Sequence, residues 1–173
     1  GKMFACHYAE IEPDIMCLGK ALTGGYVSFA ATLATDAVAD AISDGNPGLF
    51  MHGPTFMANP LACAAANASL DLIEREGLLE RINAIGKILA RELAPLADSD
   101  AVSDVRKLGA IGVVELKKPV DMGGFQDSLV SRGVWLRPFG RLLYTMPPYI
   151  IGDEDLRTVA RAMVETVREC AEK

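Results

Sequence analysis

The sequence predicts an α/β chain in two parts, and three observations support this. Short apolar runs that end at glycine alternate with segments of helical periodicity, as in proteins that interleave strands with helices. The pattern up to about residue 77 favours a parallel sheet, whereas beyond Pro95 it favours a compact α+β unit. The chain has 173 residues, of which 50% are hydrophobic, so it is long enough to bury a core.

The elements of the first part follow from short local signals. Residues 14–18 (DIMCL) form an apolar run that stops at Gly19 and predicts a buried strand. Residues 27–33 (VSFAATL) predict a second strand. A short helix is expected over residues 38–42, followed by the turn signal DGNPG at residues 44–48.

The strongest helix signal begins at Asn59 and Pro60. Asparagine is a good N-cap, and proline is tolerated in the first helical turn. Apolar residues then recur at spacings of three and four until Gly77, which favours the end of a helix. A second helix is expected from Leu78 until Pro95, and it should lead from one part to the other.

The second part predicts a small sheet with helices. Strands are expected over residues 102–105 and 110–116, and a helix over 123–132. Residues 134–137 and 142–146 are expected to pair as a hairpin. Asp153 is the predicted N-cap of a last helix. The apolar face of that helix is formed by Leu156, Ala160, Met163, Val167 and Cys170.

Composition excludes several classes of function. The formal charge is −6 with no basic run, which disfavours binding to nucleic acid or anionic membranes. We expect neither a transmembrane helix nor a signal peptide, because no apolar run or charged leader pattern fits either. The four cysteines and two histidines match no metal-site spacing, so we expect no metal and read the cysteines as free thiols of a cytoplasmic protein.

The first candidate for chemistry is Lys20, within LGKALTGG. It directly follows a predicted strand, at the kind of edge where open α/β sheets bind ligands. A lysine desolvated there would have a lowered pKa and a nucleophilic amine, as a Schiff-base lysine requires. The glycines would let a flat ligand approach the backbone. The alternative is a solvated turn lysine. A phosphate-binding P-loop is excluded, because Lys20 precedes the glycine pair.

Two further segments are candidates. The loop of residues 51–60 enters the strongest helix, and its amides and hydroxyl could hold an anion, although a simple capped loop is the alternative. His52 alone is read as a packed, hydrogen-bonded residue. Arg137 ends a predicted apolar strand, where a buried guanidinium suits a carboxylate or phosphate, or a structural ion pair. Tyr144 on the return strand could point to the same side as Arg137, or simply pack in the core.

Taken together, four segments resemble the C-terminal part of a fold-type I, class III pyridoxal-phosphate aminotransferase. They are LGKALTGG, HGPTFMANPLACAAA, DVRKLGAIGVVEL and GVWLRPFGRLLYTMPPYI. The resemblance covers essentially the whole chain. The lysine motif is general to the class, whereas the second and fourth segments are closest to the branch that acts in biotin synthesis. Residues 1–77 would then be the C-terminal portion of the large cofactor-binding domain, and residues 78–173 the small α+β domain with its leading helix.

The resemblance also implies roles for individual residues. Lys20 would hold pyridoxal phosphate as a Schiff base and, once freed, would shuttle a proton. Pro54 and Thr55 match a segment that reaches the cofactor phosphate across a dimer interface. The implied substrate-binding residues are Lys20, Gly53, Arg137 and Tyr144, with Arg137 receiving the carboxylate of the oxo acid. The implied reaction is amino transfer from S-adenosylmethionine to 8-amino-7-oxononanoate in a homodimer with shared active sites.

Some of the family's active-site residues match nothing in this chain. The aspartate that pairs with the pyridine nitrogen, the glycine–serine phosphate loop and the ring-holding aromatic residues would all lie upstream of Gly1. We therefore expect half of an active site and no activity from the chain alone. Another class III ω-aminotransferase, or a non-catalytic α/β module, remains an alternative. We also expect residues from about 78 onward to fold alone better than residues 1–77, whose sheet would have open edges.

Overall fold

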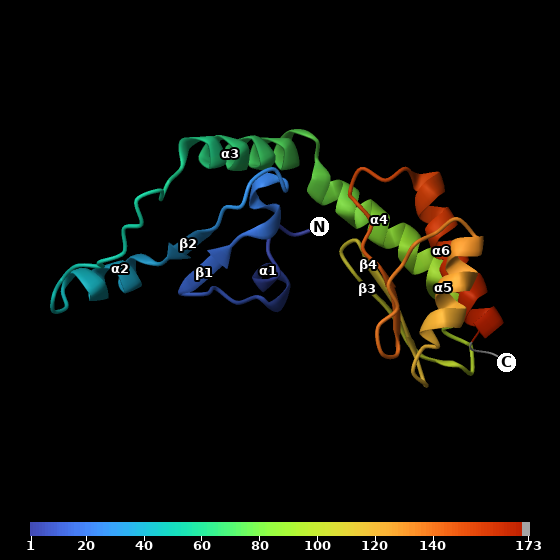
Figure 1. Ribbon diagram of the computed structural model, residues 1–173. Helices are drawn as coiled ribbons and strands as arrows, with labels where there is room; N and C mark the ends of the chain where they lie inside the picture. The colour runs from blue at the N-terminus through green and yellow to red at the C-terminus, as the bar shows by residue number, and fades with distance from the viewer. Residues whose placement is uncertain (171–173) are drawn as a thin grey trace. The chain divides into compact units, whose positions relative to one another are not determined.

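The computed structural model describes residues 1–170 and divides into two compact units (Figure 1). One unit spans Lys2–Leu78, and the other begins at Leu79. Among the described residues, no helix is long and apolar enough to cross a membrane.

The first unit contains one short sheet and several helices. In chain order these are α1 (Cys6–Ala9), β1 (Ile15–Leu18), the 3-10 helix η1 (Lys20–Thr23), β2 (Ala31–Ala34), α2 (Asp36–Ser43) and α3 (Pro60–Arg75). The parallel sheet predicted for this part is wrong, because β1 and β2 pair antiparallel, with Leu18 opposite Ala31. The intervening segment turns back through η1 and a glycine pair, without the long crossover that parallel neighbours need. The predicted burial of β1 is also wrong, because none of its residues is buried.

Helix α3 begins where the sequence predicts. The Asn59 side chain accepts hydrogen bonds from the backbone N–H groups of Leu61 (3.0 Å) and Ala62 (3.2 Å). These bonds satisfy two of the four N–H groups that a helix start leaves open. The helix then packs against η1 and buries Ala62 and Ala66. The predicted N-cap therefore fixes the start of the helix that supports the lysine turn.

The second unit is a three-stranded antiparallel sheet with three long helices (Figure 1). Its elements are α4 (Leu78–Leu93), η2 (Ala94–Leu96), β3 (Val102–Leu108), β4 (Ile111–Leu116), α5 (Met122–Ser131), β5 (Leu142–Thr145) and α6 (Asp153–Cys170). Strand β4 is central, and its Val114 is fully buried with Leu143 of β5 opposite. Helix α4 packs on this face so closely that a Cβ at Gly112 would lie 3.1 Å from Leu93 Cδ1.

The predicted hairpin of residues 134–137 with 142–146 is wrong. Residues 134–137 form no strand, and only a single bridge joins Phe139 to Leu142. Strand β5 pairs with β4 instead, and Pro138 has no N–H to donate to a ladder. Asp153, the predicted N-cap, is instead the first residue of α6, so the helix begins one residue earlier than predicted.

The hydrophobic core lies in the second unit. The cluster of fully packed apolar side chains extends from Ile82 to Val167 and includes Phe125, Leu129 and Met163. In the first unit, the buried side chains are those of Thr23, Ala62 and Ala66. Because large apolar side chains contribute most of the free energy of burial, we expect the second unit to be the more stable of the two.

An ion pair between Arg81 and Asp153 in the second unit predicts how the stability of this unit responds to acid. Arg81 Nη1 lies 2.7 Å from Asp153 Oδ1, and the same guanidinium donates to the carbonyls of Tyr149 and Ile151. The hydrogen bond from Arg81 lowers the pKa of the Asp153 carboxyl. A lowered folded-state pKa gives stability that is present above the unfolded pKa and is lost as the pH falls through the folded value.

We therefore expect the free energy of unfolding to decline below about pH 4 more steeply in the wild type than in Asp153→Asn. Urea unfolding at a series of pH values measures this difference. Asp155→Asn is the matched control, because Asp155 lies in the same first turn of α6 and has no bond to Arg81. Parallel pH curves for the wild type and Asp153→Asn would contradict the prediction.

Candidate active site

Lys20 occupies an unusual backbone conformation directly after β1. It is the first residue of η1, and its φ of 47° lies in the left-handed region. For a residue with a side chain this conformation costs about 1–2 kcal/mol, so the surrounding turn must hold it in place. The side chain is exposed, as the alternative of a solvated turn lysine implies, and within residues 1–170 its terminal nitrogen makes no hydrogen bond or ion pair. No contact within the described chain therefore occupies the end of the side chain.

The turn that carries Lys20 is held from two sides. Thr23 is 1% exposed, and its Oγ1 donates a 2.6 Å hydrogen bond to the carbonyl of Val27. Ser69 on α3 donates to the carbonyl of Ala21 at 3.5 Å. Gly24 follows with a φ of 62°, and a Cβ there would lie 3.8 Å from Ser69 Oγ. The sequence prediction did not include Thr23 or Ser69, although the hydroxyl of Thr23 within a glycine-rich turn is a visible signal.

The loop before α3 exposes the other residues predicted to bind the cofactor. Gly53, Pro54 and Thr55 are all exposed. Nothing lies within 4 Å of a Cβ built on Gly53. Among the described residues, no hydrogen bond or ion pair connects this loop to Lys20. The structure does not, therefore, bring these predicted residues together with the lysine within the first unit.

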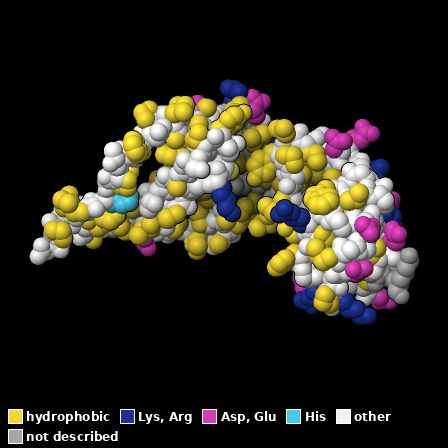
Figure 2. Space-filling view, viewed as in Figure 1, with side chains coloured by type: hydrophobic (Ala, Val, Ile, Leu, Met, Phe, Trp, Pro, Cys, Tyr) yellow, Lys and Arg dark blue, Asp and Glu magenta, His cyan; other side chains and the backbone are white. Residues whose placement is uncertain are grey.

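The same loop is strongly apolar at its surface. Phe56 is 86% exposed and Met51 is 82% exposed, and Leu49, Phe50 and Met57 are exposed as well. Hydrophobic side chains line the surface of this segment (Figure 2). His52 is exposed rather than packed as predicted, and its ring lies 5.7 Å from that of Phe50. We call residues 49–57 the apolar loop.

Arg137 and Tyr144 belong to the second unit. Arg137 is exposed rather than buried, and no carboxylate of residues 1–170 forms an ion pair with it. Tyr144 lies on β5, half-buried, opposite Val113 of β4. The single bridge joins Phe139 to Leu142, so Arg137 and Tyr144 are the residues two positions further out on each side. No strand pairing past this bridge joins Arg137 to Tyr144, so the proximity of the two side chains stays a prediction.

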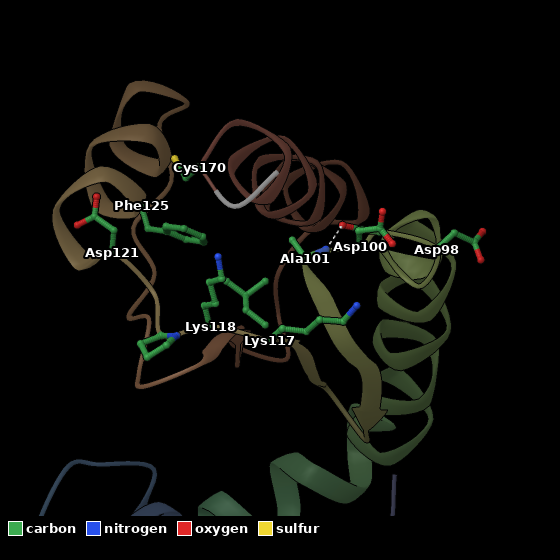
Figure 3. Close-up of a pocket in the computed structure, with 11 residues that line it drawn as sticks. Asp98, Asp100, Ala101, Lys117, Lys118, Asp121, Phe125 and Cys170 are labelled. Carbon is green, nitrogen blue, oxygen red and sulfur yellow. Dashed lines mark hydrogen bonds between the residues drawn. The ribbon is translucent and has the colours of Figure 1, made fainter. Parts of the chain in front are cut away.

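A separate cavity of about 700 Å³ lies within the second unit (Figure 3). It is lined by Asp98, Ser99, Asp100, Ala101, Leu116, Lys117, Lys118, Pro119, Asp121, Phe125 and Cys170. None of the predicted site residues lines it. Figure 3 shows the Lys118 side chain pointing toward Phe125 and the space between α5 and α6. Three aspartates and two lysines line this cavity, so its lining favours no single charge of ligand.

The family model of class-III aminotransferases matches residues 1–167. The chain belongs to the class-III aminotransferase family. The predicted family and fold class are therefore confirmed, including the fold of the pyridoxal-phosphate-dependent transaminases.

Individual members of the family can be compared with this class-III chain. It is 50% identical to the adenosylmethionine-8-amino-7-oxononanoate aminotransferase of Corynebacterium glutamicum, over 97% of this chain and 40% of that protein. The crystal structure of the Methanocaldococcus jannaschii enzyme of the same name superposes with a TM-score of 0.81 at 34% identity, covering 98% of this chain and 42% of that one. A pyridoxal-phosphate-bound amine transaminase from an uncultivated Pseudomonas species gives a TM-score of 0.86 at 31% identity, covering 98% and 41%. The chain thus spans about 40% of the length of the relatives it matches.

Proposed function

We propose that this chain carries the cofactor lysine and part of the substrate site of a pyridoxal-phosphate-dependent aminotransferase of biotin synthesis. The reaction is amino transfer from S-adenosylmethionine to 8-amino-7-oxononanoate, which gives 7,8-diaminononanoate. The names of relatives at 40–50% identity support this assignment. The observation that carries the proposal is the placement of Lys20 after β1, in a left-handed backbone conformation and with no partner for its terminal nitrogen among the described residues.

The residues present fit two groups of pyridoxal phosphate, its aldehyde and its phosphate. Lys20 offers an amine without a competing partner, and a Cβ built on Gly25 would meet nothing within 4 Å, so a flat ring could approach this turn. Thr55 offers an exposed hydroxyl and Pro54 a fixed backbone, which would hold the phosphate. When bound, the cofactor supplies an aldehyde for the lysine and a ring that withdraws electrons from the substrate.

Lys20 would act through Nζ in two ways. It would hold the cofactor before the substrate arrives, and afterwards its free amine would carry a proton to or from the reacting carbon. Exposure of the side chain in the first unit leaves Nζ able to make both kinds of contact. No other residue of η1 carries a group that titrates.

Arg137 would bind the carboxylate of the oxo acid, with Tyr144 beside it and Gly53 contacting the substrate through its backbone. Without an ion pair among the described residues, the guanidinium of Arg137 keeps its fork free for a carboxylate. This role distinguishes the proposal from another class III ω-aminotransferase, which would pair Arg137 with a different acid. A panel of oxo acids and ketones as amino acceptors separates the two.

We further propose a cytoplasmic homodimer with shared active sites. The apolar loop supports this, because so many large side chains exposed together are typical of a surface that a partner covers. Gly53, Pro54 and Thr55 lie in that loop, without a bond to Lys20. In a dimer they would serve the lysine of the partner subunit. The four free thiols fit a reducing compartment.

The proposal is tested by adding pyridoxal phosphate, reducing with borohydride and mapping the modified peptides by mass. We expect a pyridoxyl group at Lys20, and little at Lys2, whose ammonium donates to the carbonyl of His7. The reaction is carried out on the 173-residue chain and on a form extended upstream of Gly1 to the length of the relatives. Labelling scattered evenly over the lysines of the extended form would overturn the proposal.

A further inference from the structure

We infer that Thr23, with support from Ser69, is a positioning residue for Lys20. The inference rests on the proposed function of Lys20 and goes beyond it by naming what holds the amine in place. Lys20 has a backbone conformation that costs free energy, and nothing bonded to its own side chain compensates for that cost. The compensation must therefore come from the rest of the turn.

The packing of the first unit is concentrated beneath this turn. Large apolar side chains of the unit are mostly exposed, and its buried side chains are Thr23, Ala62 and Ala66. The two alanines lie on α3, which packs against η1. Small side chains at these positions let the helix approach the turn closely. The best-packed place in the unit is thus the support of the lysine rather than a general core.

Thr23 closes the turn with two hydrogen bonds to the same short segment. Its Oγ1 donates to the carbonyl of Val27 at 2.6 Å, and its own carbonyl accepts from the N–H of Tyr26 at 3.2 Å. A buried hydroxyl gains little from the hydrophobic effect, and its burial is favourable only when it is bonded. A valine would fill the same volume but would leave the carbonyl of Val27 without this donor.

Ser69 supports the turn from the helix side. Its hydroxyl donates to the carbonyl of Ala21, the residue after Lys20, at the long distance of 3.5 Å. Gly24 packs near the same hydroxyl. The two hydroxyls thus restrain η1 at both ends, and Thr23 makes the shorter and more buried bond. Together they would keep the Lys20 amine directed to one place, which a reactive amine requires.

The first experiment measures how readily the η1 turn opens in the absence of the cofactor. Trypsin cleaves after lysine only where the backbone can open, so the rate of cleavage between Lys20 and Ala21 reports on η1. Relative to cleavage after Lys2, we expect Thr23→Val to raise this rate about tenfold, as the loss of a buried hydrogen bond implies. Thr23→Ser, which keeps the hydroxyl, should stay near the wild-type rate.

The matched control is Thr32→Val. Thr32 lies exposed on β2 in the same unit, and its hydroxyl has only a long contact of 3.7 Å with Cys17 Sγ. It undergoes the same chemical change without loss of a buried bond, so we expect no change in cleavage after Lys20. If Thr23→Val instead unfolds the whole unit, cleavage after Lys2 rises equally. Ser69→Ala then decides, with an expected increase of about threefold after Lys20 alone.

The second experiment tests whether loosening the η1 turn lowers the reactivity of the Lys20 amine. In the form extended upstream of Gly1, pyridoxyl labelling of Lys20 should fall about tenfold in Thr23→Val and be restored in Thr23→Ser. Labelling and cleavage unchanged in Thr23→Val and Ser69→Ala would overturn the inference while leaving the proposed function intact. Absence of labelling in the wild type would instead reject the proposed function, and the cleavage rates would still show whether Thr23 holds the turn.

Discussion

Replacement of Lys20 by alanine is expected to lower amino transfer by about 10³-fold or more, since positioned acid–base catalysis alone contributes about 10²–10⁴-fold. The measurement is the rate of 7,8-diaminononanoate formation, in the form extended upstream of Gly1. The fold should survive, because the exposed Lys20 side chain makes no bond to the rest of the described chain. Thermal unfolding of the variant should therefore match the wild type.

Two variants show whether the lost activity belongs to the amine. Lys20→Arg keeps the positive charge but not an amine that can lose its proton, so it should be as inactive as Lys20→Ala. Lys2→Ala removes another lysine of the same unit and should retain activity. A Lys20→Ala variant within tenfold of the wild-type rate would show that another group performs the chemistry.

The second large effect is expected from a substitution in the core of the second unit, and it concerns the free energy of unfolding. Phe125→Ala is expected to lower the free energy of unfolding by about 3–5 kcal/mol, since it deletes a large side chain from a closed core. Phe125 is 1% exposed and belongs to the cluster shared by the sheet and helices. Since such a unit has about 5–15 kcal/mol of stability in total, the variant should lose a large share of that stability. Urea unfolding of the unit from Leu79 onward measures this.

Phe139→Ala provides the matched control, because it is the same substitution at a side chain that is 74% exposed. Its cost should be within about 0.5 kcal/mol. The same core implies that limited proteolysis will degrade residues 2–78 before the unit that begins at Leu79. Degradation of both units at one rate, or equal effects of the two phenylalanine variants, would show that the cluster is not the source of stability.

Local signals predicted the helices well because their causes are local. The bonds from Leu61 and Ala62 to Asn59 form within one turn of chain, and an asparagine before a proline specifies them directly. The same holds for the apolar face of α6, where Leu156, Ala160 and Met163 are fully buried as predicted.

Strand pairing was less predictable because it depends on distant partners. The direction of β2 is set by how residues 19–30 turn back, and no apolar pattern encodes that direction. Residues 134–137 have the apolar run of a strand, but β5 takes β4 as its partner and leaves them unpaired. Arg137 thereby loses the strand that was expected to bury it.

The residues of the candidate site could be predicted from the sequence, but the contacts that hold Lys20 in place could not. The motif around Lys20 predicts which side chain reacts, yet its left-handed backbone and the bond from Thr23 to Val27 appear only in three dimensions. A sequence pattern indicates chemistry at single positions. The strain at one residue and its relief at another are properties of the folded turn.

The left-handed backbone at Lys20 has a consequence for protein engineering. Glycine adopts that conformation at little cost, so substitution of glycine at position 20 would be selected by any procedure that optimises folding stability alone. The same change would remove the amine on which the proposed chemistry depends. Libraries designed to raise the thermal stability of this chain should therefore keep Lys20 unchanged. Glycine, the residue with the lowest conformational cost at that position, would remove the activity without lowering the stability.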